Sequence, residues 1–434
     1  MPGRVFHTSD WHLGRQIGRH RRDGEFDAVL NETVEIAADF APDLIVHSGD
    51  LFDGPRPSLD DVRRAAQALR RLGEIAPVVV VAGNHDTPYV LAFLEFVLTD
   101  MGNRDGDQVR VRFATDARPG GLLIAEYPAA GGDLTLRIGG LPYLHPNRFA
   151  YDFANPAMAT AAYAERIRAV QADVYRRLAA DRGPRDVLVF ATHLFIEGAT
   201  PSHSERQISI AADYAVAACD LPGVDYGALG HIHRPQNVDR AGFPARYAGS
   251  PLQLDFGETR DTKSVVLAEI APGKQPRIEL APLTSGRRLT HLEGTLEEIA
   301  QRAGRVGDAW VKAVVNVEVP TAFLPETLAK MLPEATIVDI EERHPGATSL
   351  VLDRDTSAGE LPSVEELLRS YLPGRGTTGL VLDRTMVTFA QLRAEPDPTD
   401  SAPCCEETLL TAAIAGDSLE GIDRAGLLVA AETT

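Results

Sequence analysis

Seven side chains of the kinds that bind divalent metals are gathered in short blocks within the first 235 residues. The blocks are Asp10-Trp11-His12, Gly49-Asp50 with Asp53, Gly83-Asn84-His85-Asp86, His193 and Gly230-His231-Ile232-His233. They supply two aspartates, one asparagine and four histidines as candidate ligands. Mixed oxygen and nitrogen ligands suit a pair of divalent ions a few ångströms apart, an arrangement that displaces an oxygen at phosphorus. The blocks therefore predict a two-metal phosphoesterase.

Each block lies at the end of an apolar run that is typical of a β-strand. The runs cover residues 5–7, 44–47, 77–82, 187–191 and 224–229. Between the first three runs, residues 26–40 and 59–72 carry apolar side chains at helical spacing, which predicts a β-α-β-α-β succession. Open α/β sheets bind their ligands at the carboxyl ends of their strands, so we expect the polar blocks to meet there.

Taken singly, most blocks have a simpler explanation. A Gly-Asp pair after a strand can be a plain turn, and a lone histidine such as His193 is more often structural. Gly83-Asn84-His85-Asp86 is more specific, although a turn is its alternative too. His231 and His233 are alternate residues of an extended segment and so share one face, as metal-binding histidines do; a surface pair is the alternative. Five blocks in this order, each after a strand, favour a metal centre.

The composition limits the class of protein. The chain has 434 residues, of which 44% are hydrophobic and 24% charged, enough for two or three globular domains. Its net charge of −19 counts against a protein that coats DNA by itself. No apolar run approaches the roughly 20 residues of a membrane helix, and no signal peptide is evident. Three cysteines (Cys219, Cys404 and Cys405) are too few for a disulfide framework. We therefore expect a cytoplasmic protein without membrane segments.

The pattern along the chain predicts three regions, with boundaries at 1–285, 286–345 and 346–434. The first is the metal-binding domain, and its last part, residues 243–285, is predicted to be a β-meander. The second is a small α/β cap with strands at 289–292, 310–318 and 336–341 and helices at 296–302 and 324–331. The third is a helical and linker segment, in which a capping box at Ser363 begins a helix that runs to Tyr371. A further Ala/Leu-rich stretch begins at Glu406.

Longer strings around the blocks carry a family resemblance. These are residues 7–14 (HTSDWHLG), 49–53 (GDLFD) followed by Arg56-Pro57-Ser58, Ser204-Glu205-Arg206, 228–236 (ALGHIHRPQ), 247–252 (YAGSPL) and 256–258 (FGE). With these strings the chain resembles the calcineurin-like metallophosphoesterases and, more narrowly, the SbcD family of nuclease subunits from bacterial SbcCD complexes. The likeness is strong over residues 1–285, architectural over 286–345 and loose beyond. It implies a four-layer αββα sandwich with a small α/β cap domain and a helical C-terminal tail.

The resemblance also implies a role for each residue of the blocks. One metal ion would be held by Asp10, His12, Asp50 and His233. The second would be held by Asp50, Asn84, His193 and His231, with Asp50 bridging the two. The expected metal is manganese, with magnesium as the alternative. The ions would activate a water for in-line attack on phosphorus.

His85 binds no metal in this interpretation and would face the scissile phosphate as a catalytic residue. The resemblance places the carboxylate of Asp53 where it would orient His85, and Asp86 is the rival for that role. Arg15 and Arg56 are further candidates for contacts to the substrate or to the residues around it.

The family implies the activity and the partners. The chain would cleave DNA as a double-strand exonuclease and a single-strand or hairpin endonuclease, acting on DNA ends and hairpins in repair, replication and recombination. Its activity would depend on ATP through the ATPase SbcC, which would be bound by the helical tail, and the chain would form a homodimer through its nuclease domain.

Two other interpretations stay open at this point. The runner-up is a stand-alone metallophosphoesterase that acts on small phosphodiesters or phosphoproteins, which the metal site alone does not exclude. The third is a DNA-end binding subunit that has lost catalysis; the presence of every expected ligand and of His85 disfavours it.

Overall fold

The computed structural model describes residues 1–99, 110–118, 121–145, 156–202, 204–205, 215–317, 323–343, 364–374 and 379–394. The chain divides into two compact units, Met1–Arg343 and His344–Thr434, and each is described by itself. Arg206, the predicted helix cap Ser363, Cys404, Cys405 and the stretch from Glu406 lie outside the described residues. No helix among the described residues is long and apolar enough to cross a membrane.

The first large sheet has the strand order β12-β11-β1-β2-β3-β4. Its strands are β1 (Gly3–Thr8), β2 (Leu44–His47), β3 (Val78–Val81), β4 (Val111–Ala114), β11 (Ser264–Ile270) and β12 (Arg277–Pro282). Strands β1 to β4 are parallel, and the helices that connect them are α1 (Asp23–Phe40), α2 (Leu59–Ile75) and α3 (Pro88–Thr99). Every residue of β2 and β3 is buried, as expected for central parallel strands that are covered on both faces.

The second large sheet has the order β5-β6-β7-β8-β10-β9. Its strands are β5 (Leu123–Pro128), β6 (Thr135–Leu141), β7 (Asp186–His193), β8 (Tyr226–Gly230), β9 (Gln236–Asn237) and β10 (Ala245–Tyr247), and helix α4 (Pro156–Ala179) joins β6 to β7. The β-meander predicted at 243–285 is confirmed for β11 and β12, which are consecutive antiparallel strands, but not for β10. Strand β10 pairs with β8 in this sheet, whereas β11 and β12 return to the first sheet beside β1. Strand pairing depends on distant residues, which local alternation cannot identify.

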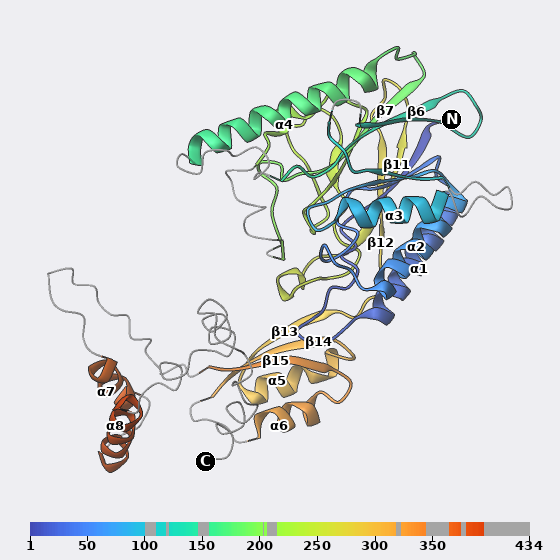
Figure 1. The fold of residues 1–434 in the computed structure, drawn as a ribbon. Coiled ribbons are helices and arrows are strands. Elements are labelled where there is room, and N and C mark those ends of the chain that lie inside the picture. Colours follow the sequence, from blue (N-terminus) through green and yellow to red (C-terminus); the bar gives the residue numbers. More distant parts are fainter. Residues whose placement is uncertain are drawn as a thin grey trace, which may run out of the picture. The chain divides into compact units, whose positions relative to one another are not determined.

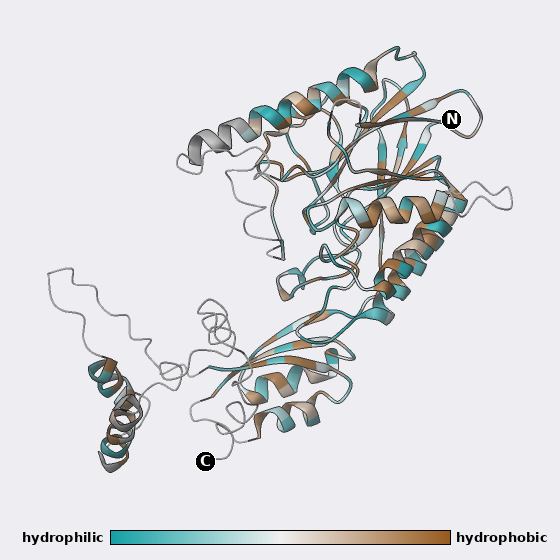
Figure 2. Cartoon of the chain, viewed as in Figure 1, coloured by the Kyte–Doolittle hydropathy of each residue, from teal (hydrophilic) through white to brown (hydrophobic). Residues whose placement is uncertain are grey.

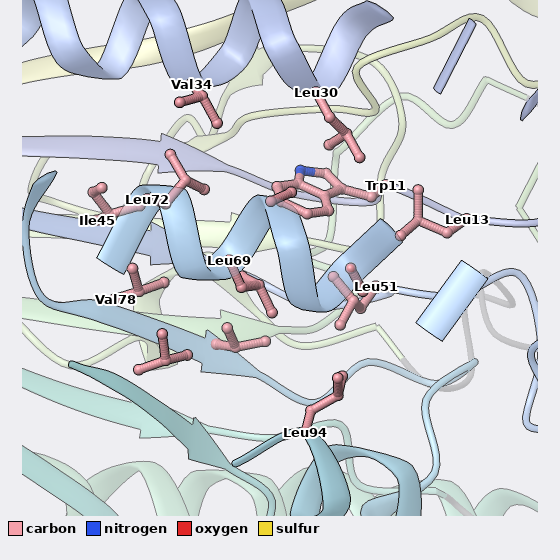
Figure 3. Close-up of a cluster of buried hydrophobic side chains, with 14 of the residues drawn as sticks. Trp11, Leu13, Leu30, Val34, Ile45, Leu51, Leu69, Leu72, Val78 and Leu94 are labelled. Atoms are coloured by element: carbon pink, nitrogen blue, oxygen red, sulfur yellow. The ribbon is translucent and has the colours of Figure 1, made fainter. Parts of the chain in front are cut away.

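The two sheets pack face to face, with helices on their outer faces (Figure 1). Alternate side chains of each strand of the first sheet enter different cores: Phe6 packs with α1 and α2, whereas its neighbour Val5 packs against the second sheet. The core on the helix side is built around Trp11, Leu69 and other buried apolar side chains (Figure 3). A third core lies between the second sheet and α4. This is the predicted four-layer αββα sandwich.

A smaller sheet follows in the same unit, with the order β13-β14-β15 and parallel pairing throughout. Its strands are β13 (Leu289–Gly294), β14 (Trp310–Asn316) and β15 (Thr336–Arg343), and its helices are α5 (Leu296–Arg302) and α6 (Leu324–Met331). Helix α5 begins with a capping box formed by Thr295 and Glu298. Both helices pack on one core of this sheet, which confirms the small α/β cap. In the second unit, α7 (Val364–Gly374) and α8 (Gly379–Ala394) pack against each other.

Candidate metal centre

The polar blocks meet where strands of the two large sheets end side by side. Asp10, Asp50 and Asn84 follow β1, β2 and β3 of the first sheet, while His193 ends β7 and His231 follows β8 of the second. Six of the seven predicted ligands are at most 3% exposed: Asp10, His12, Asp50, His193, His231 and His233. Asn84 is half-buried. The two sheets therefore bring together residues that are more than 200 positions apart in sequence.

The backbone at the centre adopts conformations that side chains normally avoid. Asp10, His12, Asp50 and His231 all have positive φ, between 46° and 103°. Each such residue costs about 1–3 kcal/mol, and residues of this kind concentrate at functional sites. Glycine is required beside them: a Cβ on Gly83 would lie 2.1 Å from Oδ1 of Asp50. The glycines of the blocks thus let strand ends approach more closely than any side chain would permit.

Asp50 lies at the middle of the cluster. Its Oδ2 is 3.4 Å from Nε2 of His12 and 3.3 Å from Nε2 of His193. Nε2 of His85 is 4.0 Å from the same oxygen. The other oxygen, Oδ1, accepts a hydrogen bond of 2.8 Å from the backbone N–H of His85. One carboxylate therefore faces imidazoles from three separate segments of the chain.

The remaining predicted ligands form a group on each side of Asp50. On one side, candidate ligand atoms of Asp10, His12 and His233 all lie within 4.8 Å of one another. On the other, Oδ1 of Asn84 is 3.0 Å from Nε2 of His193 and 2.9 Å from Nδ1 of His231. The backbone N–H of His231 donates to Asp10 at 3.1 Å and links the two groups. All seven predicted ligands thus lie in one cluster, in two groups that share Asp50.

The cluster fits divalent cations because imidazole nitrogens and carboxylate oxygens face one another within it at 3.3 to 3.4 Å. Nε2 of the buried His12 lies 3.4 Å from Oδ2 of Asp50, and its Nδ1 lies 3.3 Å from the carboxylate of Asp53. Nε2 of His193 and Nδ1 of His231 are 3.2 Å apart and can share only one proton. Two buried aspartates add negative charge beside these nitrogens. A cation between such atoms would satisfy both the lone pairs and the charge.

Electrostatics within the cluster favour a charged pair in the metal-free protein. Burial by itself lowers the pKa of His193, but the adjacent Asp50 raises it to about 9. Burial raises the pKa of Asp50, yet the imidazoles of His193 and His85 hold it well below its usual value. Burial also raises the pKa of Asp10. His193 therefore carries a proton at neutral pH that a metal ion has to displace.

Metal affinity is accordingly expected to rise with pH. Below the His193 pKa of about 9, a proton has to leave before Nε2 can bind a cation, so affinity rises by about tenfold per pH unit and then levels off. The same proton also stabilises the metal-free fold, because the pKa of His193 is higher in the folded chain than the value of about 6.5 in the unfolded chain. This stabilisation is complete below a pH of about 6.5 and is lost as the pH rises through about 9. Calorimetric Mn²⁺ titrations between these pH values measure the slope, and a pH-independent affinity would contradict this expectation.

His85 is held at the edge of the cluster by the backbone. Its Nδ1 donates a 2.6 Å hydrogen bond to the carbonyl oxygen of Asp53, and its ring lies edge-on to the ring of His12, with centroids 4.7 Å apart. This hydrogen bond directs Nε2 towards Asp50. The distances also permit a group of His12, Asp50 and His85 around one ion, so geometry alone leaves both roles of His85 open.

The roles expected of Asp53 and Asp86 need correction. The backbone carbonyl of Asp53, rather than its carboxylate, accepts the hydrogen bond from His85. The carboxylate lies instead 3.3 Å from Nδ1 of His12 and 3.6 Å from Nη1 of Arg15. The carboxylate of Asp86 accepts backbone N–H bonds of 2.9–3.2 Å from Gly83, Leu51 and Phe52. Asp86 thus ties together the loops after β2 and β3, and its burial raises its pKa to about 6.

The two candidate arginines differ in position. Arg15 lines a cavity of about 460 Å³ together with Asp53 and Phe256, and its Nε donates to the carbonyl oxygen of Leu254 at 3.4 Å. Arg56 is exposed, three residues after Asp53. The structure therefore places Arg15 next to the cluster and leaves the role of Arg56 a prediction.

Further residues contact the predicted ligands without having been singled out from the sequence. Ser204 and Glu258 lie 2.6 and 3.3 Å from Nδ1 of His233, and both belong to strings that carry the family resemblance. Tyr143 stacks on His231 with ring centroids 5.9 Å apart and an angle of 22°. For Tyr143 the sequence held no signal, because the loop after β6 carries no recognisable block.

Comparison with known proteins agrees with this geometry. Residues 3–235 match the family described as calcineurin-like phosphoesterase. The chain is 29% identical over 416 residues to the SbcD subunit of the nuclease SbcCD from Bacillus subtilis, covering 92% of this chain and 100% of the relative. It is 30% identical over 390 residues to the corresponding SbcCD nuclease subunit of Escherichia coli K12, covering 85% and 92%. The corresponding protein of Rhodobacter capsulatus is 30% identical over 287 residues, covering 63% and 68%. The chain therefore belongs to the calcineurin-like phosphoesterases and, among them, to the SbcD family of SbcCD nuclease subunits.

Proposed function

We propose that the chain is the nuclease subunit of an SbcCD-type complex and hydrolyses phosphodiester bonds of DNA with two divalent metal ions. The observation that carries this proposal is the gathering of the seven candidate ligands in one cluster around Asp50, with Nε2 of His85 directed at the same carboxylate. In this proposal Asp10, His12, Asp50 and His233 hold one ion, and Asp50, Asn84, His193 and His231 hold the other. The proposed metal is manganese, as the family resemblance implies; the mixed nitrogen and oxygen ligands by themselves suit iron or zinc as well.

Residues around the ions would each have a separate role in the reaction. The bound ions would supply activation of a water molecule and neutralisation of charge on the phosphoryl oxygens. Nδ1 of His85 donates to the carbonyl of Asp53, so Nε2 is left to contact the substrate. As an imidazolium, His85 would pass its Nε2 proton to the leaving oxygen and keep the Nδ1 proton in the hydrogen bond to Asp53. Asp86 fixes the loops that carry Asp50 and His85. Arg15, which lines the cavity beside Asp53, would contact a phosphate of the bound strand.

The decisive experiment compares substrates under matched conditions. Labelled duplex and hairpin DNA and the small diester bis-p-nitrophenyl phosphate are incubated with the protein, with and without SbcC, ATP and Mn²⁺. We expect Mn²⁺-dependent DNA cleavage, exonucleolytic on duplex ends and endonucleolytic on hairpins, that SbcC and ATP stimulate. Efficient cleavage of the small diester with none of DNA would favour the stand-alone phosphoesterase instead. Binding of DNA without cleavage at saturating Mn²⁺ would favour a subunit that has lost catalysis.

Binding of SbcC is proposed for the helical tail. Helices α7 and α8 expose Val364, Tyr371, Val381 and Val387, each at least 40% accessible, on a unit of only two described helices. Apolar side chains of this kind are typical of a surface that a partner covers. Deleting residues 350–434 is expected to abolish co-purification with SbcC while Mn²⁺-dependent cleavage of the small diester continues. Unchanged co-purification would disprove the assignment of this segment.

A homodimer through the nuclease domain is proposed from the surface of α3. Most of this helix is hydrophobic (Figure 2). Tyr89, Phe93 and Phe96 are 88%, 55% and 50% exposed and follow one another at helical spacing, so they share one face. The variant Phe93→Glu, Phe96→Glu is expected to sediment as a monomer where the unaltered protein sediments as a dimer. Identical sedimentation of the two proteins would contradict the use of this face.

A further inference from the structure

A buried cluster of charged and polar side chains lies directly behind His233. Nδ1 of His233 is 2.6 Å from Oγ of Ser204, and the Ser204 hydroxyl in turn donates to Oε1 of Glu258. The other oxygen of Glu258 is 2.6 Å from Nζ of Lys263 and accepts the backbone N–H of Leu254 at 3.0 Å. Glu258 and Lys263 are 0% and 5% exposed. Both charges are therefore removed from water and paired with each other.

This arrangement determines which nitrogen of His233 faces the candidate ions. An Nδ1–H that donates to Ser204 leaves the lone pair of Nε2 free on the side of Asp10 and His12. The carboxylate of Glu258 accepts from Ser204 and so fixes the direction of this hydrogen bond. Partners of this kind orient histidine ligands and raise their basicity, and removing them typically lowers metal affinity about 10–100-fold.

The segment that carries Glu258 is also attached to the cap sheet. Glu258 ends a short 3₁₀ helix, η5 (Phe256–Glu258). Phe256 packs on a cluster of buried side chains from both parts of the unit, namely Ile17, Leu289 and Trp310. The side chain of Gln253 bridges the two parts. Its Oε1 accepts the backbone N–H of Leu289 at 2.8 Å, and its Nε2 donates to the carbonyl of Glu258 at 3.0 Å.

We infer that Glu258 is a positioning residue for His233 and that Gln253 makes its placement depend on the cap. In this proposal, which rests on the proposed two-metal function, contacts of β13 hold η5 in place, and η5 holds His233 through Glu258 and Ser204. When the cap contact at Leu289 is lost, His233 is held less firmly and one of the two ions binds more weakly. Because the second group of ligands lies across Asp50 from His233, the other ion is unaffected.

The test measures the two Mn²⁺ affinities of the full-length protein by calorimetric titration. Ser204→Ala removes the hydrogen bond to His233, and the pair Glu258→Gln, Lys263→Met removes both buried charges together so that neither is left unpaired. Each is expected to weaken one Mn²⁺ site about 10–100-fold and to leave the other within about twofold. Gln253→Ala is expected to weaken the same site by a smaller factor, about 3–10-fold.

A matched control removes a different attachment near the cap. Glu32 on α1 accepts backbone N–H bonds of Thr284 and Ser285 at 2.9–3.0 Å, just before the cap begins, and these bonds do not involve His233. Glu32→Ala is therefore expected to leave both Mn²⁺ affinities unchanged. A merely structural role of the cluster would lower the melting temperature of all variants without changing the ratio of the two affinities, and that result would overturn the inference.

The outcomes separate this inference from the proposed function. If the unaltered protein binds no Mn²⁺, the two-metal proposal itself fails. If it binds two ions and both Ser204→Ala and Gln253→Ala bind them equally well, the positioning role fails while the two-metal proposal stands. Should the double variant at Glu258 and Lys263 not fold, as judged by circular dichroism, these two single variants decide the question, because each removes an uncharged side chain.

Discussion

Replacing His85 with glutamine is expected to lower kcat for phosphodiester cleavage about 10²–10⁴-fold, the contribution typical of a positioned general acid. Both metal ions should still bind, because Nε2 of His85 is the most distant of the three imidazole nitrogens that face Asp50, at 4.0 Å against 3.3 and 3.4 Å. Glutamine keeps a polar side chain of similar length but cannot transfer a proton. Single-turnover kinetics with hairpin DNA measure the loss, and calorimetry with Mn²⁺ measures the metal content.

The control for this variant is His291→Gln, which alters an exposed histidine on β13 and should leave both measurements unchanged. Loss of a metal ion from His85→Gln would refute the catalytic role, since His12, Asp50 and His85 are close enough to hold an ion between them. Normal kcat with two ions bound would show instead that His85 does not take part in the reaction. The double readout is needed because the position of His85 is compatible with either role.

Replacing Asp50 with asparagine is expected to abolish the binding of both metal ions and to lower turnover by about 10³-fold or more. Asp50 is the predicted shared ligand, and the charge stabilisation that bound metals supply is worth several kcal/mol. The amide also removes the negative charge that raises the pKa of His193, so that pKa should fall from about 9 towards its usual value. Metal analysis of the dialysed protein and Mn²⁺ titration measure the binding.

Asp53→Asn is the matched comparison for Asp50→Asn. It also exchanges a carboxylate for an amide, but the Asp53 carboxylate contacts only one predicted ligand, His12, at 3.3 Å, and the hydrogen bond to His85 comes from its backbone. We expect two ions still to bind, with affinity for one of them reduced about tenfold. Two tightly bound ions in Asp50→Asn, or equal losses in the two variants, would contradict a central position for Asp50.

Local sequence determined the strands and the residues that follow them. The runs before Asp10, Asp50 and Asn84 are short and apolar, and in the structure they are the parallel strands β1, β2 and β3, buried as such runs have to be. Polar side chains placed immediately after buried strands are recognisable because nothing else in the pattern requires them. This is why the candidate ligands could be selected from the sequence alone. Their assignment to two metal ions came from the family resemblance.

Only the tertiary structure decided how the surrounding residues act. The contact to His85 comes from a backbone carbonyl of Asp53, and every residue has such a group, so sequence cannot single it out. The expected meander at 243–285 holds for the neighbours β11 and β12 but not for β10, which pairs with β8. Strand β11 also pairs with β1, more than 250 residues away, and pairing at that distance leaves no local pattern.

The cluster behind His233 likewise could be recognised only in the folded structure. Ser204 lies between β7 and β8, whereas Glu258 and Lys263 lie between β10 and β11, and each residue type is ordinary on a protein surface. What makes them specific is burial, because a carboxylate and an ammonium group that are both removed from water have to be paired and hydrogen-bonded. The sequence by itself therefore determined which residues could hold the metals. The packing of two sheets and a cap decided what holds those residues, since burial and long-range contact exist only in the folded chain.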